Sequence, residues 1–221
     1  MQSVLVVREG GLAGLAAGLA ARPDILLLEG VAGLEPPNRC GPEPRIFVRI
    51  GPLDSDGVGA ELEAALGAGI RGIWLPGAIG RRSVEQLGAK LAVREAEHGT
   101  EIGSTRIIAS VESAQGALAV GSLSVAGPRL AGLAWDERAI RRELGLPADV
   151  SPREPDPAPC LQIRAMLVLA ARAAGILAID GPCNPADASD GLASAVARAR
   201  RDGFSGMLAL TPAQVAGIRT A

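Results

Sequence analysis

The sequence contains few of the side chains that usually move protons or form covalent intermediates. Among its 221 residues there is no tyrosine, His98 is the only histidine, and Lys90 is the only lysine among 22 basic residues. Most acid–base and Schiff-base catalysis uses those three residue types. Any catalysis must therefore depend on carboxylates, arginines, backbone groups or a metal ion.

Cysteine and excess charge are also scarce. The three cysteines, Cys40, Cys160 and Cys183, form neither an even set nor a CxxC pair, which favours a reduced, cytoplasmic environment. The net charge of −2 provides no general basic field for nucleic acid or an anionic bilayer. Residues 12–21 are apolar, but glycine interrupts them and they are too short to span a membrane. We therefore expect a soluble, cytoplasmic protein with no nucleic-acid or membrane partner.

The hydrophobic pattern predicts one domain, residues 1–221, built from alternating strands and helices. Hydrophobic residues make up 48% of the chain and charged residues 21%, as in compact globular proteins. Short apolar, β-branched runs alternate with longer amphipathic or alanine-rich segments, which is typical of repeated β-α units. The expected strands are residues 3–7, 25–28, 46–50, 72–75, 106–111, 130–135, 176–179 and 206–210. The expected helices are residues 12–21, 57–66, 81–98, 114–125, 137–144, 160–174, 186–202 and 212–218.

Eight parallel strands, each followed by a helix or an excursion, predict a closed (β/α)₈ TIM barrel, with an open doubly wound sheet as the alternative. In the barrel, ligands bind at the carboxyl ends of the strands. Residues 31–44 contain glycine and proline, and we expect no regular helix there. The proline-rich residues 147–159 are expected to form a long loop over the same face, either as a functional lid or as a plain connector.

Charged residues lie at or just beyond the ends of several expected strands. Glu112 follows the run RIIASV and precedes a helix, so its carboxylate should face the barrel mouth, where it needs a cation or a hydrogen-bond donor. Arg49 ends the run IFVRI and is suited to bidentate capture of a carboxylate. An ion pair with Glu29 or Glu112 is the alternative role for Arg49. Asp136 and Asp180 also follow strands and are further candidates.

Short segments spread along most of the chain carry a resemblance to a known family. They include RIFVRI with PLDS, GIWLP, GSTRII, VESA, PRLAGL and AIDGP, in that order. In these segments the sequence resembles the HpcH/HpaI aldolase and citrate lyase β-subunit family. The resemblance implies a Mg²⁺-dependent (β/α)₈ barrel of the phosphoenolpyruvate/pyruvate type that cleaves or forms a carbon–carbon bond in a 3-hydroxyacyl-CoA, and it implies a homo-oligomer.

The resemblance also implies roles for individual residues. Arg49 matches the arginine that binds the substrate carboxylate, and Glu112 matches one of two acidic metal ligands. The second ligand falls on Ala139, and the histidine of a later motif is Thr211. The chain also ends at Ala221, where relatives continue with a C-terminal extension.

Two functional hypotheses follow from these matches and departures. In the first, the protein is a carbon–carbon lyase in which Asp136 or Glu29 joins Glu112 in holding Mg²⁺, while Arg49 binds a 2-oxo, carboxylate or acyl-CoA substrate. In the second, it is a non-catalytic paralogue that retains the barrel and serves as a binding or partner subunit. No local motif for recognition of coenzyme A occurs in the sequence.

Overall fold

The computed structural model describes residues 1–8, 12–30, 45–147, 156–182 and 189–220. Its strands are β1 (Gln2–Val7), β2 (Ile25–Glu29), β3 (Arg45–Arg49), β4 (Gly72–Leu75), β5 (Arg106–Val111), β6 (Leu130–Trp135), β7 (Leu177–Asp180) and β8 (Gly206–Ala209). Its helices are α1 (Leu12–Ala20), α2 (Val58–Gly67), α3 (Arg81–Glu97), α4 (Ala114–Ala119), the 3₁₀ helix η1 (Val120–Val125), α5 (Glu137–Glu143), α6 (Ala158–Ala174), α7 (Ser189–Asp202) and α8 (Pro212–Thr220).

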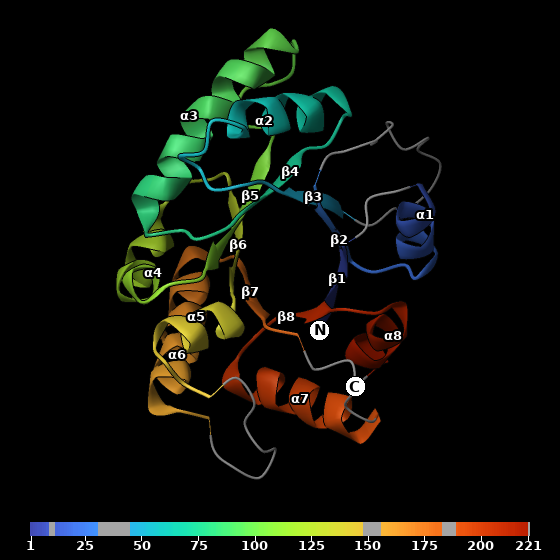
Figure 1. Ribbon diagram of the computed structural model, residues 1–221, viewed down its shortest axis with the longest axis vertical. Coiled ribbons are helices and arrows are strands. Elements are labelled where there is room, and N and C mark those ends of the chain that lie inside the picture. Colours follow the sequence, from blue (N-terminus) through green and yellow to red (C-terminus); the bar gives the residue numbers. More distant parts are fainter. Residues whose placement is uncertain (9–11, 31–44, 148–155, 183–188, 221) are drawn as a thin grey trace.

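The strands form a closed barrel in the order of the sequence, and the helices surround it (Figure 1). Every neighbouring pair of strands is parallel, and β8 pairs with β1 from Gln2↔Gly206 to Leu5↔Ala209. This confirms the predicted (β/α)₈ barrel, and the alternative of an open sheet is wrong. All eight predicted strands are present, with ends that differ by at most one residue from the prediction.

The predicted helix over residues 114–125 divides into α4 and η1. The hydroxyl of Ser122 donates to the carbonyl of Ala119 at 2.7 Å, and that of Ser124 donates to Gly121 at 2.8 Å. Serine hydroxyls that bond to backbone carbonyls three residues earlier compete with the regular helical pattern. The second half of the segment is accordingly a tighter 3₁₀ helix.

The proline-rich loop is shorter than expected, because α6 begins at Ala158, within the segment assigned to the loop. Proline is tolerated in the first turn of a helix, where its missing N–H needs no partner, and Pro159 occupies this position. Residues 148–155 of the predicted loop and all of residues 31–44 lie outside the described residues. Both α3 and α6 have 17 residues, and none of the described helices combines the length and apolarity needed to cross a bilayer.

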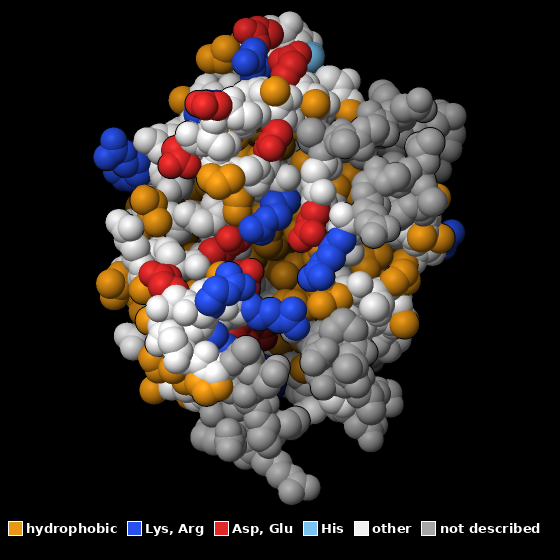
Figure 2. Space-filling view, in the orientation of Figure 1, with side chains coloured by type: hydrophobic (Ala, Val, Ile, Leu, Met, Phe, Trp, Pro, Cys, Tyr) orange, Lys and Arg blue, Asp and Glu red, His pale blue; other side chains and the backbone are white. Residues whose placement is uncertain are grey.

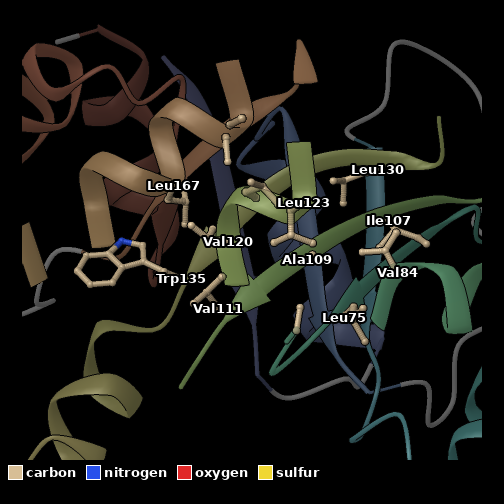
Figure 3. Packing of buried hydrophobic residues seen from close by; sticks show 14 of the residues in the cluster. Leu75, Val84, Ile107, Ala109, Val111, Val120, Leu123, Leu130, Trp135 and Leu167 are labelled. Atoms are coloured by element: carbon tan, nitrogen blue, oxygen red, sulfur yellow. The ribbon is translucent and has the colours of Figure 1, made fainter. Parts of the chain in front are cut away.

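The hydrophobic core has an inner and an outer part. The interior of the barrel is filled by a cluster of inward-facing side chains from the strands: Val4, Val6, Ile25, Leu27, Phe47, Trp74, Ile108, Ala134 and Ile179. The intervening strand residues, such as Val111 and Trp135, pack outward against the helices (Figure 3). Successive side chains along a strand point to opposite faces, so the inner cluster identifies which residues at the strand ends face the barrel axis.

Candidate functional site

Three strands at the carboxyl end of the barrel end in charged, inward-facing positions. Each of three residues lies two positions after a member of the inner cluster: Arg8 directly after β1, Glu29 at the end of β2 and Arg49 at the end of β3. Glu29 and Arg49 are paired in register, and the pair Val7↔Leu28 places Arg8 beside Glu29. Charges of alternating sign therefore line this side of the mouth, and Figure 2 shows acidic and basic side chains around a central hollow with hydrophobic atoms at its base.

Arg49 and Glu112 contact each other across the mouth. Arg49 Nη2 donates to Glu112 Oε2 at 3.1 Å, and Arg49 Nη1 lies 3.0 Å from Glu112 Oε1. The two side chains are 32% and 16% exposed, so water reaches the pair only partly. Glu112 Oε1 is buried and, apart from this ion pair with Arg49, accepts no hydrogen bond among the described residues, so it can take a further cation or donor. The structure thus places two of the predicted site residues together, in the ion pair named as one alternative for Arg49.

Glu29 is more exposed and interacts weakly. Its carboxylate lies 4.0 Å from Arg8 Nε, and the two side chains are 39% and 62% exposed. An ion pair of this length at the surface contributes little to stability. Both side chains are therefore available to a ligand that enters the mouth.

Asp136 lies beside Glu112 at the ends of adjacent strands. β5 and β6 pair as far as Val111↔Trp135, and the Asp136 N–H donates to the Val111 carbonyl at 2.9 Å. Asp136 is also the N-cap of α5, because its Oδ1 accepts a hydrogen bond from Ala139 N at 3.0 Å. One carboxylate oxygen thus supports the helix, which leaves Oδ2 for a further contact.

The carboxylates present meet the minimum requirement for Mg²⁺. Magnesium in proteins usually binds one or two carboxylates and completes its octahedron with water and substrate oxygens. Glu112, whose buried Oε1 contacts Arg49 alone, and Asp136, whose Oδ2 has no hydrogen bond within the described part of the chain, are two such carboxylates at the ends of neighbouring strands. Within the described ranges, no group of three or more histidine, cysteine, aspartate or glutamate side chains is placed to hold a metal ion.

Asp180 faces away from the mouth. Its neighbour Ile179 belongs to the inner cluster, so the Asp180 side chain points outward toward α6. There it is 4% exposed and accepts hydrogen bonds from Arg164 Nη1 at 2.6 and 2.8 Å and from Trp135 Nε1 at 3.0 Å. The structure therefore separates Asp180 from Glu112 and Arg49 and assigns it a structural ion pair between the barrel and its helices.

Other polar contacts near the mouth were not anticipated from the sequence. Arg141 of α5 bonds to Glu137 and lies 3.5 Å from Asp156, which also pairs with Arg198 of α7. These contacts connect α5 and α7 through Asp156, which lies two residues before α6, and no spacing in the sequence indicates them. For Arg164, by contrast, the sequence does contain a signal of a buried ion pair, because this residue lies within the buried stripe of α6 that includes Ile163. A charged side chain in such a stripe usually has a buried partner.

Comparison with known proteins identifies the family. Residues 39–212 match the family described as HpcH/HpaI aldolase/citrate lyase. The chain belongs to this family. The citrate lyase subunit beta of Haemophilus influenzae is 29% identical over 168 residues, which are 76% of this chain and 56% of that protein. The Escherichia coli K12 subunit is 29% identical over 169 residues, 76% of this chain and 54% of that protein. The matched part of the chain thus spans about half the length of these relatives.

Solved structures of similar proteins share the barrel. The citrate lyase beta subunit of Mycobacterium tuberculosis has a TM-score of 0.79 and 22% identity, with 99% of this chain and 95% of that chain covered. RipC from Yersinia pestis has a TM-score of 0.75 and 24% identity, with 100% and 94% covered. At this identity the likeness establishes the fold of the HpcH/HpaI chain and not its substrate.

Proposed function

We propose that this HpcH/HpaI family protein is a carbon–carbon lyase that binds Mg²⁺ and a small carboxylate substrate at the barrel mouth. The observation that carries the proposal is the contact of Arg49 with Glu112, in which a partly buried guanidinium pairs with a carboxylate whose buried Oε1 has no partner other than Arg49 among the described residues. An M. tuberculosis relative has been solved as a citrate lyase beta subunit complexed with oxaloacetate and magnesium. We infer that the same class of ligand, a 2-oxo carboxylate or its 3-hydroxyacyl-CoA precursor, binds here.

In this proposal Arg49 binds the substrate carboxylate through its two parallel N–H donors. Arg49 then shares its guanidinium between the substrate and Glu112, so the ion pair seen here holds the guanidinium in place before substrate binds. Arg8 adds a second positive charge at the mouth for a dicarboxylate. These residues orient the substrate and neutralise its charge.

Glu112 and Asp136 are the residues proposed to hold Mg²⁺. Glu112 would contribute Oε1, and Asp136 would contribute Oδ2 while its Oδ1 continues to cap α5. When bound, Mg²⁺ supplies a Lewis acid that polarises the substrate carbonyl and stabilises the negative charge formed as the carbon–carbon bond breaks. Glu29, which is exposed and only weakly paired, remains an alternative second ligand.

A second candidate function is a binding or partner subunit without catalysis. It is favoured by the mutual neutralisation of Arg49 and Glu112 and by Ala139, which provides no carboxylate where the family resemblance implies a metal ligand. Such a protein would bind the carboxylate without stabilising the charge of the transition state. The two candidates therefore differ in their response to Mg²⁺ and in turnover.

Metal-dependent thermal shift and turnover distinguish the candidates. We expect oxaloacetate to raise the melting temperature of the native protein only with Mg²⁺, and a hundredfold excess over Kd corresponds to about 2.7 kcal/mol. Glu112→Gln and Arg49→Gln should abolish the shift. Cleavage of citryl-CoA to acetyl-CoA and oxaloacetate would support the lyase. Mg²⁺-dependent binding without cleavage would instead support the binding subunit. If the native protein shows no metal response and Ala139→Asp creates one, the lyase proposal is wrong.

A further inference from the structure

A cavity of about 540 Å³ lies at the opposite end of the barrel, where the strands begin. Three of its nine lining residues are arginines: Arg45 at the start of β3, Arg106 at the start of β5 and Arg172 in the last turn of α6. None of the lining residues is acidic. The described residues thus form a concave, positively charged site about one strand length from Arg49 and Glu112.

The strand geometry directs two of these arginines into the barrel. Phe47 and Ile108 belong to the inner cluster, so Arg45 and Arg106, each two residues earlier, face inward at its base. The strand between them, β4, has Gly72 in register with Arg106. A Cβ at position 72 would lie 2.4 Å from the Ile46 carbonyl oxygen and 2.8 Å from the Phe47 ring. No side chain therefore occupies the space between the two arginines on β4.

The three arginines have no anionic partner among the described residues. Arg45 donates to the neutral side chain of Gln2 at 2.7 Å, and Arg172 donates to the Gly203 carbonyl at 3.0 Å. By contrast, Arg129 at the same end of the barrel pairs with Glu95 at 2.7 Å. Like charges that share a concave site raise the local potential and favour an incoming anion.

A second cavity of about 430 Å³ adjoins the first and shares Arg106, Gly175 and Ile176 with it. Its other lining includes the apolar residues Leu123 and Val125 of η1, together with Pro128 and Leu130 before and within β6. The shared residues place the two cavities side by side. The combined site therefore has an arginine-lined end and a second end lined by both polar and apolar groups.

We propose that this site binds an organic phosphate with two or more negative charges. The phosphate groups lie among Arg45, Arg106 and Arg172, because guanidinium groups bind phosphate oxygens in bidentate fashion. The organic part of the ligand lies along η1 in the second cavity. The volumes are in the range of small-molecule sites. The packed interior of the barrel, including Phe47 and Trp74, separates this ligand from the mouth, so it binds apart from the carboxylate substrate proposed there.

Titration calorimetry of the full chain with ADP, inorganic pyrophosphate and citrate tests the proposal. We expect ADP to bind more tightly than pyrophosphate, because only ADP fills both cavities, and citrate to bind most weakly. The double variant Arg106→Gln/Arg172→Gln should weaken ADP binding at least about tenfold, the effect of losing one charge-assisted hydrogen bond. Arg200→Gln is the matched control, since it removes an exposed arginine from the last turn of α7 outside the cavity.

Each other outcome overturns part or all of the proposal. Absence of ADP binding to the native chain, or equal binding by the double variant and the native chain, excludes the site. Equal affinity for ADP and pyrophosphate excludes a contribution from the second cavity, and citrate binding as tightly as ADP excludes the preference for phosphate. Loss of ADP binding in Arg49→Gln would place the anion at the mouth instead. Because the lyase proposal is tested with oxaloacetate and Mg²⁺, the two can fail independently.

Discussion

At the scale of single residues, Glu95 shows how this protein stabilises a buried charge. Its side chain is fully buried, yet it accepts hydrogen bonds from Arg129 at 2.8 and 2.7 Å and from the N–H groups of Gly103 and Thr105 at 2.8 and 2.7 Å. Burial alone would raise the pKa of Glu95, but these donors lower it to about 2. The ionised carboxylate therefore connects α3 to the segments that precede β5 and β6.

We expect Glu95→Gln to lower the free energy of unfolding by about 3 kcal/mol at neutral pH, because it leaves Arg129 without its buried partner. The pKa of Glu95 is lower in the folded state than in the unfolded chain, so its stabilisation is complete above the unfolded pKa of about 4.3 and is lost as pH falls through about 2. Urea unfolding of the native protein and of Glu95→Gln at several pH values should show that the difference between their free energies of unfolding becomes smaller as pH falls. Glu97→Gln, at an exposed ion pair on the same helix, is the control and should change little. A difference between native and Glu95→Gln that does not depend on pH would contradict the account.

Arg164 and Asp180 form a second buried charged pair. Burial acts against the charge on Arg164, but Asp180 and Asp202 raise the pKa of the guanidinium. Arg164 also lies 4.7 Å from the centre of the Phe204 ring and 5.8 Å from that of Trp135. Aromatic faces stabilise such a cation. The pair fixes α6 against β7 behind the barrel.

We predict that Asp180→Asn lowers the free energy of unfolding by about 3 kcal/mol, since it removes the charge that compensates buried Arg164. Asp202→Asn, at the more exposed partner of Arg164, should have a smaller effect. Chemical denaturation measures both. Because the Asp180 side chain faces outward, ligand binding at the mouth, measured below the melting transition, should be unchanged. Loss of that binding without loss of stability would show that Asp180 belongs to the site.

At the scale of elements, the residues that follow β5 and β6 cap the next helices and also position side chains of the candidate site. Ser113 caps α4 by accepting a hydrogen bond from Gly116 N at 3.1 Å, and Asp136 caps α5 in the same way. Ser113 directly follows Glu112, and Asp136 is itself one of the carboxylates at the mouth. The cap of α4 therefore helps to orient Glu112, and the cap of α5 orients Asp136.

Two substitutions at Asp136 separate capping from metal binding. Asp136→Ala should destabilise the protein by about 1 kcal/mol through loss of the cap, whereas Asp136→Ser should retain most of the stability because serine also caps helices. Both should lose the proposed Mg²⁺ response, because neither provides a carboxylate. Thermal melts with and without Mg²⁺ and oxaloacetate measure the two effects. A normal metal response in Asp136→Ser would move the second ligand to Glu29.

At the scale of the whole molecule, closure of the barrel depends on close approach between strands. β1 pairs with both β2 and β8, so no strand edge remains in the ring. Gly72 on β4 lies so close to β3 that a Cβ there would overlap the Ile46 carbonyl. The absence of a side chain at this position is a condition for the β3–β4 pairing.

We expect Gly72→Ala to destabilise the protein by at least about 1–3 kcal/mol, the usual effect of overpacking, because the clash is with backbone that cannot rotate away. Gly57→Ala is the matched control, since its Cβ would meet nothing within 4 Å. Denaturant unfolding of the two variants tests the difference. Equal stability of Gly72→Ala and the native protein would show that β3 and β4 can move apart without cost.

The sequence by itself determined the barrel and the contents of its mouth. Short apolar runs and amphipathic segments specify strands and helices locally, and eight such repeats can satisfy their edges by closing into a ring. The carboxyl ends of parallel strands meet at one edge, so Arg49 and Glu112 could be expected there although 63 residues separate them. The family resemblance was carried by residues in these same strands and turns.

Only the tertiary structure decided which charges face the mouth and which partners they have. A difference of one position along a strand reverses the direction of a side chain, and this places Asp180 behind the barrel and Glu112 within it. The pairing of Arg164 with Asp180 and the gathering of three arginines at the base depend on elements distant in sequence. Such contacts form when distant elements pack together, so the residues involved have no regular spacing in the sequence from which the contacts could be predicted.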